Sequence, residues 1–224
     1  MAEGVSSASH RNGPVRLRVL PRGETPFSEW NDEELMLEHA RGTEAAFEEL
    51  VRRHQKGVLN YTYRMVQNRQ IAEELTQEVF LALVQNAQRY QPLAKFTTYL
   101  YAIASNIVSK EWARRKRRPA LFSLSSWAFW KDPDDAFDPL EHVSDAKPNA
   151  ASDCTRTEVS EAVNKALRTV PEQYREAFIL HRMQDLSYEE VSEITNAPIG
   201  TVKSRVVRAE RALRPLLESF RDHV

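Results

Sequence analysis

Apolar residues recur at steps of three and four in two long blocks of this chain, and no other feature of the sequence limits the possible folds as strongly. This spacing places apolar side chains on one side of a helix, where they can pack against other helices. The first block, from Asn31 onward, predicts four helices joined by short turns, and a second block begins near Thr157. The predicted fold class is therefore all-α, with two helical domains.

The residues between the apolar stripes of the first block indicate where its helices begin and end. Asp32 is expected to cap the first helix and Thr43 the second, because both side chains can accept hydrogen bonds from free backbone N–H groups. A turn is expected at Gln67-Asn68, and Gln91-Pro92 should end the third helix. The expected inner faces contain Leu35 and Met36; Phe47, Leu50, Val51, His54, Val58, Tyr61 and Met65; Ala72, Leu75, Val79, Ala82 and Leu83; and Leu100, Ile103, Ala104, Ile107 and Val108.

Between the two blocks the chain changes in charge and composition. Residues 110–118 carry six basic groups and one acid, whereas residues 132–153 carry seven acids and a single lysine. The formal net charge of −1 hides this polarity. We therefore expect four regions: a flexible extension at 1–30, a first domain at 31–118, an acidic linker at 119–156 and a second domain at 157–224.

Two local patterns lie outside the expected domains. The alternation of residues 15–19 suits a short strand, and an aromatic-rich patch at 121–130 is expected to pack against one of the domains.

Several classes of protein are disfavoured. Cys154 is the only cysteine, so the chain can form no internal disulfide, and this fits a reducing cytoplasm. No apolar run approaches the roughly 20 residues of a membrane span, and the first residues lack the apolar segment of a secretory signal. Neither a phosphate-binding loop nor a zinc-protease motif is present. We expect a cytoplasmic protein without catalytic residues, metal, cofactor or small-molecule substrate.

The second block contains the pattern of a helix-turn-helix. Ser187 can cap a helix with Glu190 three residues later, as in a capping box. Asn196 tolerates the left-handed conformation that the turn requires, and Pro198 suits the start of the next helix. That next helix has an expected inner face of Val202, Val206, Ala209 and Leu213.

The outer face of this second helix is rich in cations and hydroxyl groups. In helix-turn-helix proteins the beginning of the second helix reads base edges in the major groove. An ordinary helical hairpin would also fit the spacing, but the density of arginine on one face favours DNA binding. The candidate base-reading and phosphate-binding residues are Thr201, Lys203, Ser204, Arg205, Arg208 and Arg211.

Both blocks resemble extracytoplasmic-function (ECF) sigma factors of the bacterial sigma-70-like family. The segment 171–176 (PEQYRE), followed by LSYEEVSEITNAPIGTVKSRVVRAERAL, is similar to their C-terminal domain. In the first block, AAFEELVRRH, IAEELTQEVFLALVQ, YLYAIASN and the basic helix end match in the same order. The resemblance covers roughly residues 32–118 and 157–217.

The resemblance implies roles for both domains. The first would dock on the clamp helices of core RNA polymerase and recognise and melt the promoter −10 element, and the second would read the −35 element. The implied docking residues are Glu74, Gln77, Glu78 and Phe80. The implied −10 residues are Phe96, Tyr99, Tyr101, Asn106, Lys110, Arg114, Arg115, Arg117 and Arg118, with Lys116 as a further phosphate contact.

The chain departs from the family's pattern at three positions. It has Tyr99 and Ala102 where a tryptophan and an arginine are usual, and Asn196 where glycine is usual. Tyrosine can still stack on a base, whereas Ala102 removes a phosphate contact. The implied partners are core RNA polymerase, promoter DNA and an anti-sigma factor, and the acidic linker would follow the polymerase's RNA path.

The main alternative is a free-standing helix-turn-helix regulator. It accounts for residues 157–221 but not for the basic, aromatic first block. A gel shift on duplex DNA without polymerase separates the two, because a regulator binds such DNA and a sigma factor scarcely does.

Overall fold

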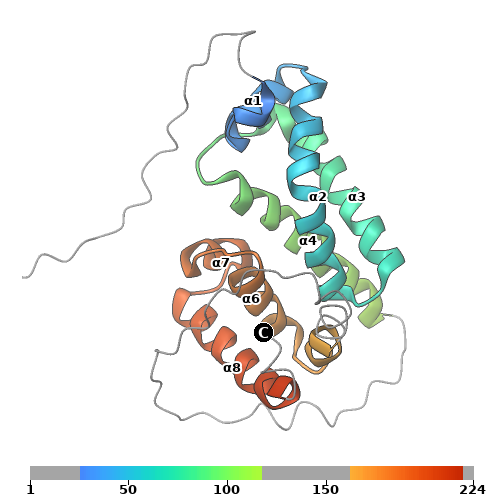
Figure 1. The fold of residues 1–224 in the computed structure, drawn as a ribbon, viewed down its shortest axis with the longest axis vertical. Coiled ribbons are helices and arrows are strands. Elements are labelled where there is room, and N and C mark those ends of the chain that lie inside the picture. Colours follow the sequence, from blue (N-terminus) through green and yellow to red (C-terminus); the bar gives the residue numbers. More distant parts are fainter. Residues whose placement is uncertain (1–25, 118–161, 219–224) are drawn as a thin grey trace, which may run out of the picture.

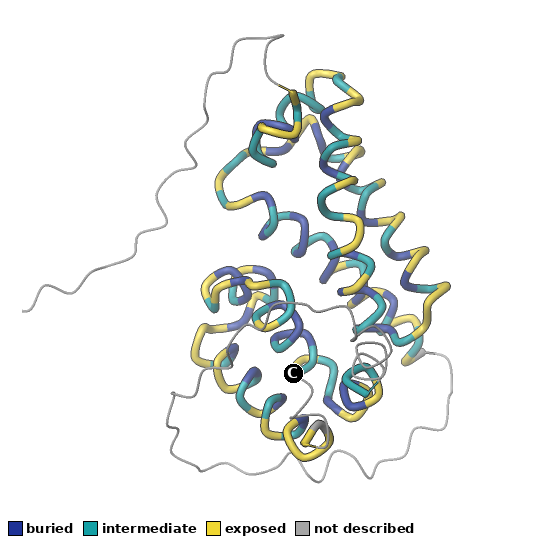
Figure 2. The backbone as a smooth tube through the Cα atoms, viewed as in Figure 1, coloured by how far each residue is buried: buried dark blue, intermediate teal, exposed yellow. Residues whose placement is uncertain are grey.

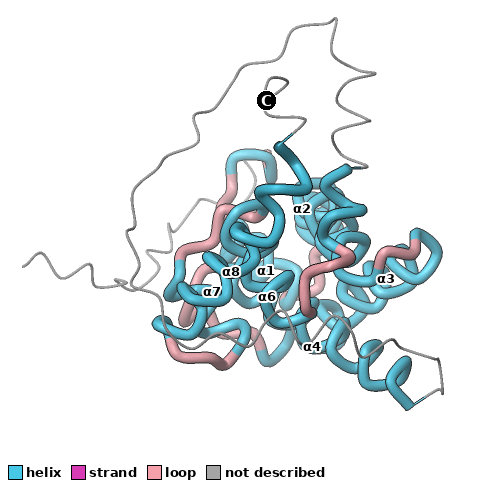
Figure 3. Tube along the Cα trace, turned by 90° about the horizontal axis from the view of Figure 1, so that it is seen from below, coloured by secondary structure: helices cyan, strands magenta, loops and turns pink. Residues whose placement is uncertain are grey.

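The computed structural model describes residues 26–117 and 162–218, and every regular element in these two ranges is a helix (Figure 1, Figure 3). The all-α prediction is therefore confirmed. The predicted strand at 15–19, the aromatic patch at 121–130 and the linker at 119–156 lie outside the described residues.

The helices form two groups that follow one another in the chain (Figure 1). Residues 162–167 form a further short helix ahead of the second group. The first group consists of the short 3-10 helix η1 (Phe27–Glu29), α1 (Asp32–Ala40), α2 (Glu44–Val66), α3 (Arg69–Asn86), the short 3-10 helix η2 (Ala87–Arg89) and α4 (Phe96–Arg117). The second consists of α6 (Glu172–Phe178), the π-helix η5 (Ile179–Met183), α7 (Tyr188–Thr195) and α8 (Ile199–Leu217).

The apolar stripes predicted from the sequence make up most of the core (Figure 2). Six residues of the predicted inner faces are only partly buried, namely Phe47, Val51, His54, Ala82, Ile103 and Ile107. The fully or nearly fully buried residues of the first group include Leu35, Met36, Leu50, Val58, Tyr61, Met65, Ala72, Leu75, Val79, Leu83, Leu100, Ala104 and Val108.

The turn between α2 and α3 forms where it was predicted. Gln67 adopts a left-handed conformation with φ 55°, and the Asn68 side chain accepts a hydrogen bond from the backbone N–H of Ile71. Thr43 occupies the cap position of α2 but makes no capping bond, because its hydroxyl donates to Glu38 at 2.9 Å instead.

The prediction that Asp32 caps α1 is wrong. Asn31 is the cap: its side chain accepts from the Glu34 backbone at 2.8 Å, and Glu34 accepts from the Asn31 backbone at 3.1 Å. Asp32 is the first residue of the helix and faces α2, where its carboxylate contacts Arg53 and His54, each at 2.8 Å.

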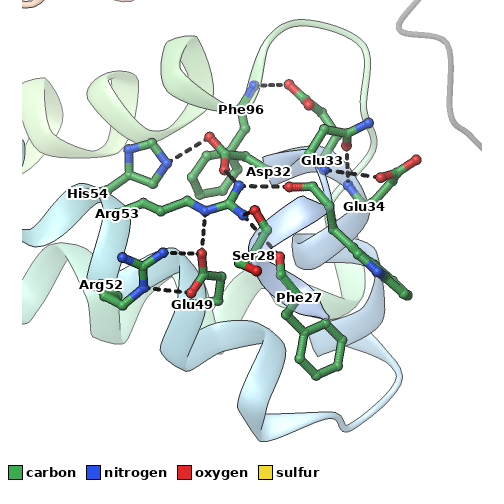
Figure 4. Close-up of polar contacts among 12 residues, drawn as sticks. Phe27, Ser28, Asp32, Glu33, Glu34, Glu49, Arg52, Arg53, His54 and Phe96 are labelled. Atoms are coloured by element: carbon green, nitrogen blue, oxygen red, sulfur yellow. Dashed lines mark hydrogen bonds and ion pairs between the residues drawn. The ribbon is translucent and has the colours of Figure 1, made fainter. Parts of the chain in front are cut away.

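Arg53 also fastens the segment before α1 to α2, as Figure 4 shows. Its guanidinium donates to the backbone carbonyls of Phe27, Ser28 and Trp30 at 2.8–3.0 Å. The hydrogen bond to Glu49 completes its set of partners. One side chain therefore replaces the hydration of three carbonyl groups and fixes how the chain enters the first bundle.

The helix-turn-helix is formed by α7 and α8. Ser187 and Glu190 make both bonds of the predicted capping box, and Asn196 has the predicted left-handed conformation with φ 48°. Ser192 donates its hydroxyl to the backbone carbonyl of Ala197 across the turn at 2.6 Å. The two helices are thus held at a fixed angle by local bonds as well as by their apolar faces.

The two bundles pack against each other. Helix α4 contacts α7, and α2 contacts both α6 and η5. The carboxyl group of Glu176, on α6, is buried between α2 and α4 and accepts hydrogen bonds from Tyr61 at 3.1 Å and Ser105 at 2.6 Å. None of the described helices has the length and hydropathy of a membrane span.

The turn of the helix-turn-helix yields a stability prediction. We expect Asn196→Ala to lower the free energy of unfolding by about 1 kcal/mol, because alanine keeps the Cβ that crowds the following carbonyl but lacks the short polar side chain that lets asparagine adopt the left-handed conformation. Asn196→Gly should be neutral or slightly stabilising, since glycine pays no such steric cost. Urea denaturation followed by circular dichroism measures both. Equal stability of the two variants would contradict this account of the turn.

Candidate nucleic-acid interface

Helix α8 presents the predicted recognition residues on its outer side. Its inner residues Val202, Val206, Ala209 and Leu213 are at most 2% exposed and hold the helix against the bundle. The outer residues Lys203, Ser204, Arg208 and Arg211 are exposed, and Thr201 and Arg205 are half-buried. The described part of the chain therefore brings all six predicted residues onto one helix.

Two side chains on α6 contact this face, and the sequence analysis missed them. Arg205 donates to the amide oxygen of Gln173 at 3.0 Å, and Arg208 donates to the hydroxyl of Tyr174 at 3.4 Å. Both partners lie in the segment directly before the helix-turn-helix. Only their sequence position near it could have pointed to them.

Lys203 is positioned by an aromatic stack. Its ammonium lies 5.5 Å from the centre of the Tyr188 ring, which stacks in turn on His181 at 4.0 Å. A cation over an aromatic face is attracted by the ring's quadrupole. The start of α8 therefore carries a cation whose direction is set by α7.

A second cationic strip follows α4. Asn106, Lys110 and Arg114 are exposed and recur every four residues, so they lie on the same side of the helix. Arg114 and Arg115 donate to the Glu111 carboxylate at 2.6 and 2.9 Å. The hydrogen bond from Arg114, the largest effect on this group, lowers the pKa of Glu111.

The basic residues at the end of α4 do not extend this strip in the described part of the chain. Lys116 donates to Glu172 of the second bundle at 2.6 Å. The side chain of Arg117 and the whole of Arg118 lie outside the described residues.

The three aromatic residues proposed for base stacking lie in different environments. Phe96 is 1% exposed and belongs to the core, with its ring 5.3 Å from that of His54. Tyr101 is 5% exposed and donates its hydroxyl to Gln184 of the second bundle. Tyr99 is half-buried and packs on Tyr90. In this conformation, only Tyr99 of the three retains more than marginal exposure.

Helix α3 exposes a mixed acidic and apolar face. Glu74, Gln77 and Glu78 are exposed, as the resemblance implied. Phe80 is half-buried and packs edge-on against Phe47. The sequence analysis missed Leu81 and Val84, which are 55% and 42% exposed on the same side as Gln77 and Glu78. The sequence did contain a sign of this surface, because α3 has more apolar residues than one inner stripe can hold.

A cavity of about 240 Å³ lies between α3 and α4 and joins the two faces. Glu74 and Glu78 line it from α3, and Lys110 and Arg114 line it from α4. No cluster of metal-ligating side chains occurs within residues 26–117 or 162–218.

Comparison with known families assigns both bundles. Residues 50–118 match the family model of sigma-70 region 2, and residues 160–213 match that of sigma-70 region 4.

Relatives of known identity match over most of their length. The RNA polymerase sigma-H factor of Pseudomonas aeruginosa is 31% identical over 83% of this chain and 95% of its own. The ECF RNA polymerase sigma factor SigW of Bacillus subtilis is 30% identical over 80% of this chain and 93% of its own. The ECF RNA polymerase sigma-E factor of Escherichia coli is 28% identical over 84% and 95%.

Solved structures share the fold. CnrH in complex with the cytosolic domain of CnrY superposes with a TM-score of 0.58 and 19% identity, covering 84% of this chain and 97% of that one. The sigma factor RpoE in complex with the anti-sigma factor NepR from Bartonella quintana gives 0.55 and 22%, covering 77% and 96%. With two sigma-70 regions in order and relatives at 30% identity over nearly their full length, the chain belongs to the ECF sigma factors of RNA polymerase.

Proposed function

We propose that residues 31–118 dock on core RNA polymerase and melt the −10 element, while residues 157–224 read the −35 element. The observation that carries this division is α8, whose cations and hydroxyls stand on the outer face of a helix-turn-helix. Such a helix fits the major groove. The protein would act in the cytoplasm, where it would meet the polymerase.

The docking surface proposed here consists of Glu74, Gln77, Glu78, Leu81 and Val84 on α3. Exposed apolar side chains that adjoin acids and an amide are typical of a protein interface. Phe80 would support this surface by packing on Phe47 and would not contact the partner itself.

The −10 surface proposed here runs along α4. Asn106 would pair with a base edge after unpairing, and Lys110 and Arg114 would hold phosphates of the duplex.

Gln173 and Tyr174, on α6, would hold Arg205 and Arg208 of α8 until these two arginines meet bases. Because the RpoE structure contains an anti-sigma factor, we include a protein of that class among the partners of this chain.

The family match already disfavours a free-standing regulator, and the docking surface is a second argument against one. A regulator that bound duplex DNA alone would have no use for the exposed apolar face of α3. Strong binding of the purified chain to a duplex −35 site without polymerase would favour it.

The docking surface predicts a specific loss of polymerase binding. Leu81→Asp should weaken co-elution with core polymerase at least tenfold, because it places an unpaired charge in an apolar contact, which costs roughly 1–3 kcal/mol or more. Leu93→Asp changes a leucine outside α3 that is more exposed than Leu81, 85% against 55%, and should co-elute like the parent. Circular dichroism checks that both variants fold. If both bind core normally, α3 is not the docking helix.

Asn106 predicts a defect in melting. Asn106→Ala should reduce open-complex formation on a duplex promoter and have a smaller effect on a template already unpaired at −10. A base contacted only after unpairing cannot assist closed binding. Permanganate footprints measure the unpaired bases, and Ser109→Ala, an exposed neighbour on α4, is the matched control. Undiminished footprints for Asn106→Ala would remove it from the site.

The arginines of α8 are predicted to divide into two kinds: those that recognise bases and those that bind phosphates. Arg205→Ala and Arg208→Ala should flatten the preference among −35 variants, because an arginine bidentate to guanine is worth about 1–3 kcal/mol of discrimination. Arg214→Ala should weaken binding to all variants alike and make the salt dependence shallower. Holoenzyme affinity is measured over single-base −35 variants at two salt concentrations. If Arg205→Ala and Arg208→Ala both behave like Arg214→Ala, this helix does not read bases through Arg205 or Arg208.

A further inference from the structure

The start of α4 is held by a residue of another helix. The backbone N–H of Phe96, the first residue of α4, donates to the Glu33 carboxylate at 2.6 Å, as Figure 4 shows. The first N–H groups of an α-helix have no acceptor within the helix and need one from outside. Glu33 supplies such an acceptor from α1, although 63 positions in the chain separate it from Phe96.

The residue directly before α4 cannot supply this acceptor with its side chain. Lys95 precedes the helix, and its ammonium group has no acceptor atom. It pairs instead with Glu190 of the second bundle at 3.1 Å. The Glu33 carboxylate also places negative charge at a helix N-terminus, where the helix dipole favours it. Helix α1 therefore provides α4 with a cap that the local sequence lacks.

Helix α1 also holds the other end of the loop before α4. The side-chain amide of Gln88, in η2, donates to the backbone carbonyl of Ala40, the last residue of α1. The loop from η2 to Phe96 is therefore fastened at both ends to one helix. Because α1 is a regular helix of nine residues, it fixes the separation of the two ends of this loop.

Two adjacent acids of α1 contact two different helices. Asp32 contacts Arg53 and His54 of α2, each at 2.8 Å, whereas Glu33 contacts α4. The ring of His54 in turn lies 5.3 Å from that of Phe96. The first turn of α4 is thereby fixed relative to α2 as well as to α1.

Three aromatic rings pack at this first turn. The ring of Tyr90 lies 6.4 Å from that of Phe96 and 5.1 Å from that of Tyr99. The Tyr90 hydroxyl is buried and has no hydrogen-bond partner among the described residues. Burial raises the pKa of Tyr90, and the charge of Glu33 is the next cause, so the carboxylate lies close to this cluster. Since no hydrogen bond fixes the Tyr90 ring, the orientation of the cluster depends on where the Phe96 backbone is held.

Tyr99 is the ring of this cluster that a base can reach. It is half-buried, whereas Phe96 and Tyr90 are 1% and 7% exposed. Its backbone N–H donates to the carbonyl of Lys95 at 3.3 Å, which is beyond the usual range of about 2.7–3.2 Å for such a bond. The first turn is thus only weakly closed by its own backbone. Without the bond to Glu33, this turn and the Tyr99 ring on it would be loosely held.

We propose that Glu33 is a positioning residue for promoter melting: it caps α4 from α1 and so holds Tyr99 where an unpaired base can stack on it. The inference rests on the proposed role of α4 at the −10 element. Glu33 belongs to the same bundle as α4, whereas the contacts of Lys95 and Thr98 with Glu190 depend on the second bundle. In this role Glu33 acts on DNA only through Tyr99.

Three substitutions separate the hydrogen bond of Glu33 from its charge. Glu33→Ala removes both, Glu33→Gln keeps an oxygen acceptor of the same reach without the charge, and Glu33→Asp keeps the charge on a side chain that is one methylene too short. Glu33→Gln should therefore resemble the parent, and Glu33→Asp should resemble Glu33→Ala. Glu44→Ala, which removes an exposed acid from the first turn of α2, is the control. If Glu33→Ala fails to fold by circular dichroism, Glu33→Asp carries the tests.

Amide hydrogen exchange of the free full-length chain tests the cap directly. The Phe96 amide should exchange at least about fivefold faster in Glu33→Ala and Glu33→Asp, the effect of losing one helix cap. In Glu33→Gln and Glu44→Ala it should exchange at nearly the parent's rate. The amide of Val58, in the middle of α2, reports overall stability. No acceleration at Phe96, or equal acceleration at Phe96 and Val58, would overturn the inference.

Promoter melting by the holoenzyme tests what the cap does. Glu33→Ala and Glu33→Asp should lower permanganate reactivity at −10 of a duplex promoter by about fivefold, in proportion to the loss of the capped turn. The loss should be smaller on a template already unpaired at −10, and co-elution with core polymerase should not change. Glu33→Gln should restore the parent's footprint, which loss of charge or of general stability would not explain. A parent-like footprint for Glu33→Ala would overturn the inference.

A double-mutant cycle decides whether Glu33 acts through Tyr99. Tyr99→Ala should lower the footprint by itself, and adding Glu33→Ala should cause little further loss, because residues that act through one contact are not additive. Losses that add in full would overturn the inference while leaving the proposed function intact. An undiminished footprint for Tyr99→Ala would instead contradict the proposed function at this residue, even where amide exchange shows the cap.

Discussion

A carboxyl group that leaves water needs hydrogen bonds to replace its hydration, and Glu176 finds them only when the two bundles meet. Its donors come from α2 and α4, which lie far from it in sequence. The remaining cross-bundle bonds are arranged around this carboxyl, and Gly57 leaves room for one of them. The relative position of the bundles thus depends on this set of polar contacts as well as on the apolar cluster that the two bundles share.

The helices were predictable because their apolar stripes are regular, and the turns were predictable where only a few residue types suit the backbone, as at Asn196. The cap of α1 was not. Asn31 and Asp32 are adjacent and both suit a cap, and the choice was decided by Arg53 and His54, which hold Asp32 from another helix. No local pattern contains that information, because it depends on how α1 packs on α2.

The candidate site shows the same division. The outer face of α8 followed directly from its inner stripe, so the exposed positions of Lys203 and Arg208 could be derived from spacing. The spacing of the aromatic residues did not distinguish core positions from exposed ones: Phe96 and Tyr99 are both aromatic and lie three residues apart, yet Phe96 is in the core and Tyr99 is half-buried. Leu81 and Val84 were missed because spacing rules assign apolar residues to the inside, and a surface made for a partner breaks that rule.

The π-helix η5 joins α6 to the helix-turn-helix, and the backbone N–H of Gln184 donates to the carbonyl of Ile179, five residues earlier. One residue more than an α-helix is therefore accommodated within this turn. Since each residue of an α-helix rotates the chain by about 100°, deleting or inserting one here would turn Gln184 and α7 away from Tyr101. Across evolution, length changes in this lineage should therefore fall in the turns, whereas the segment Ile179–Met183 keeps its residue count.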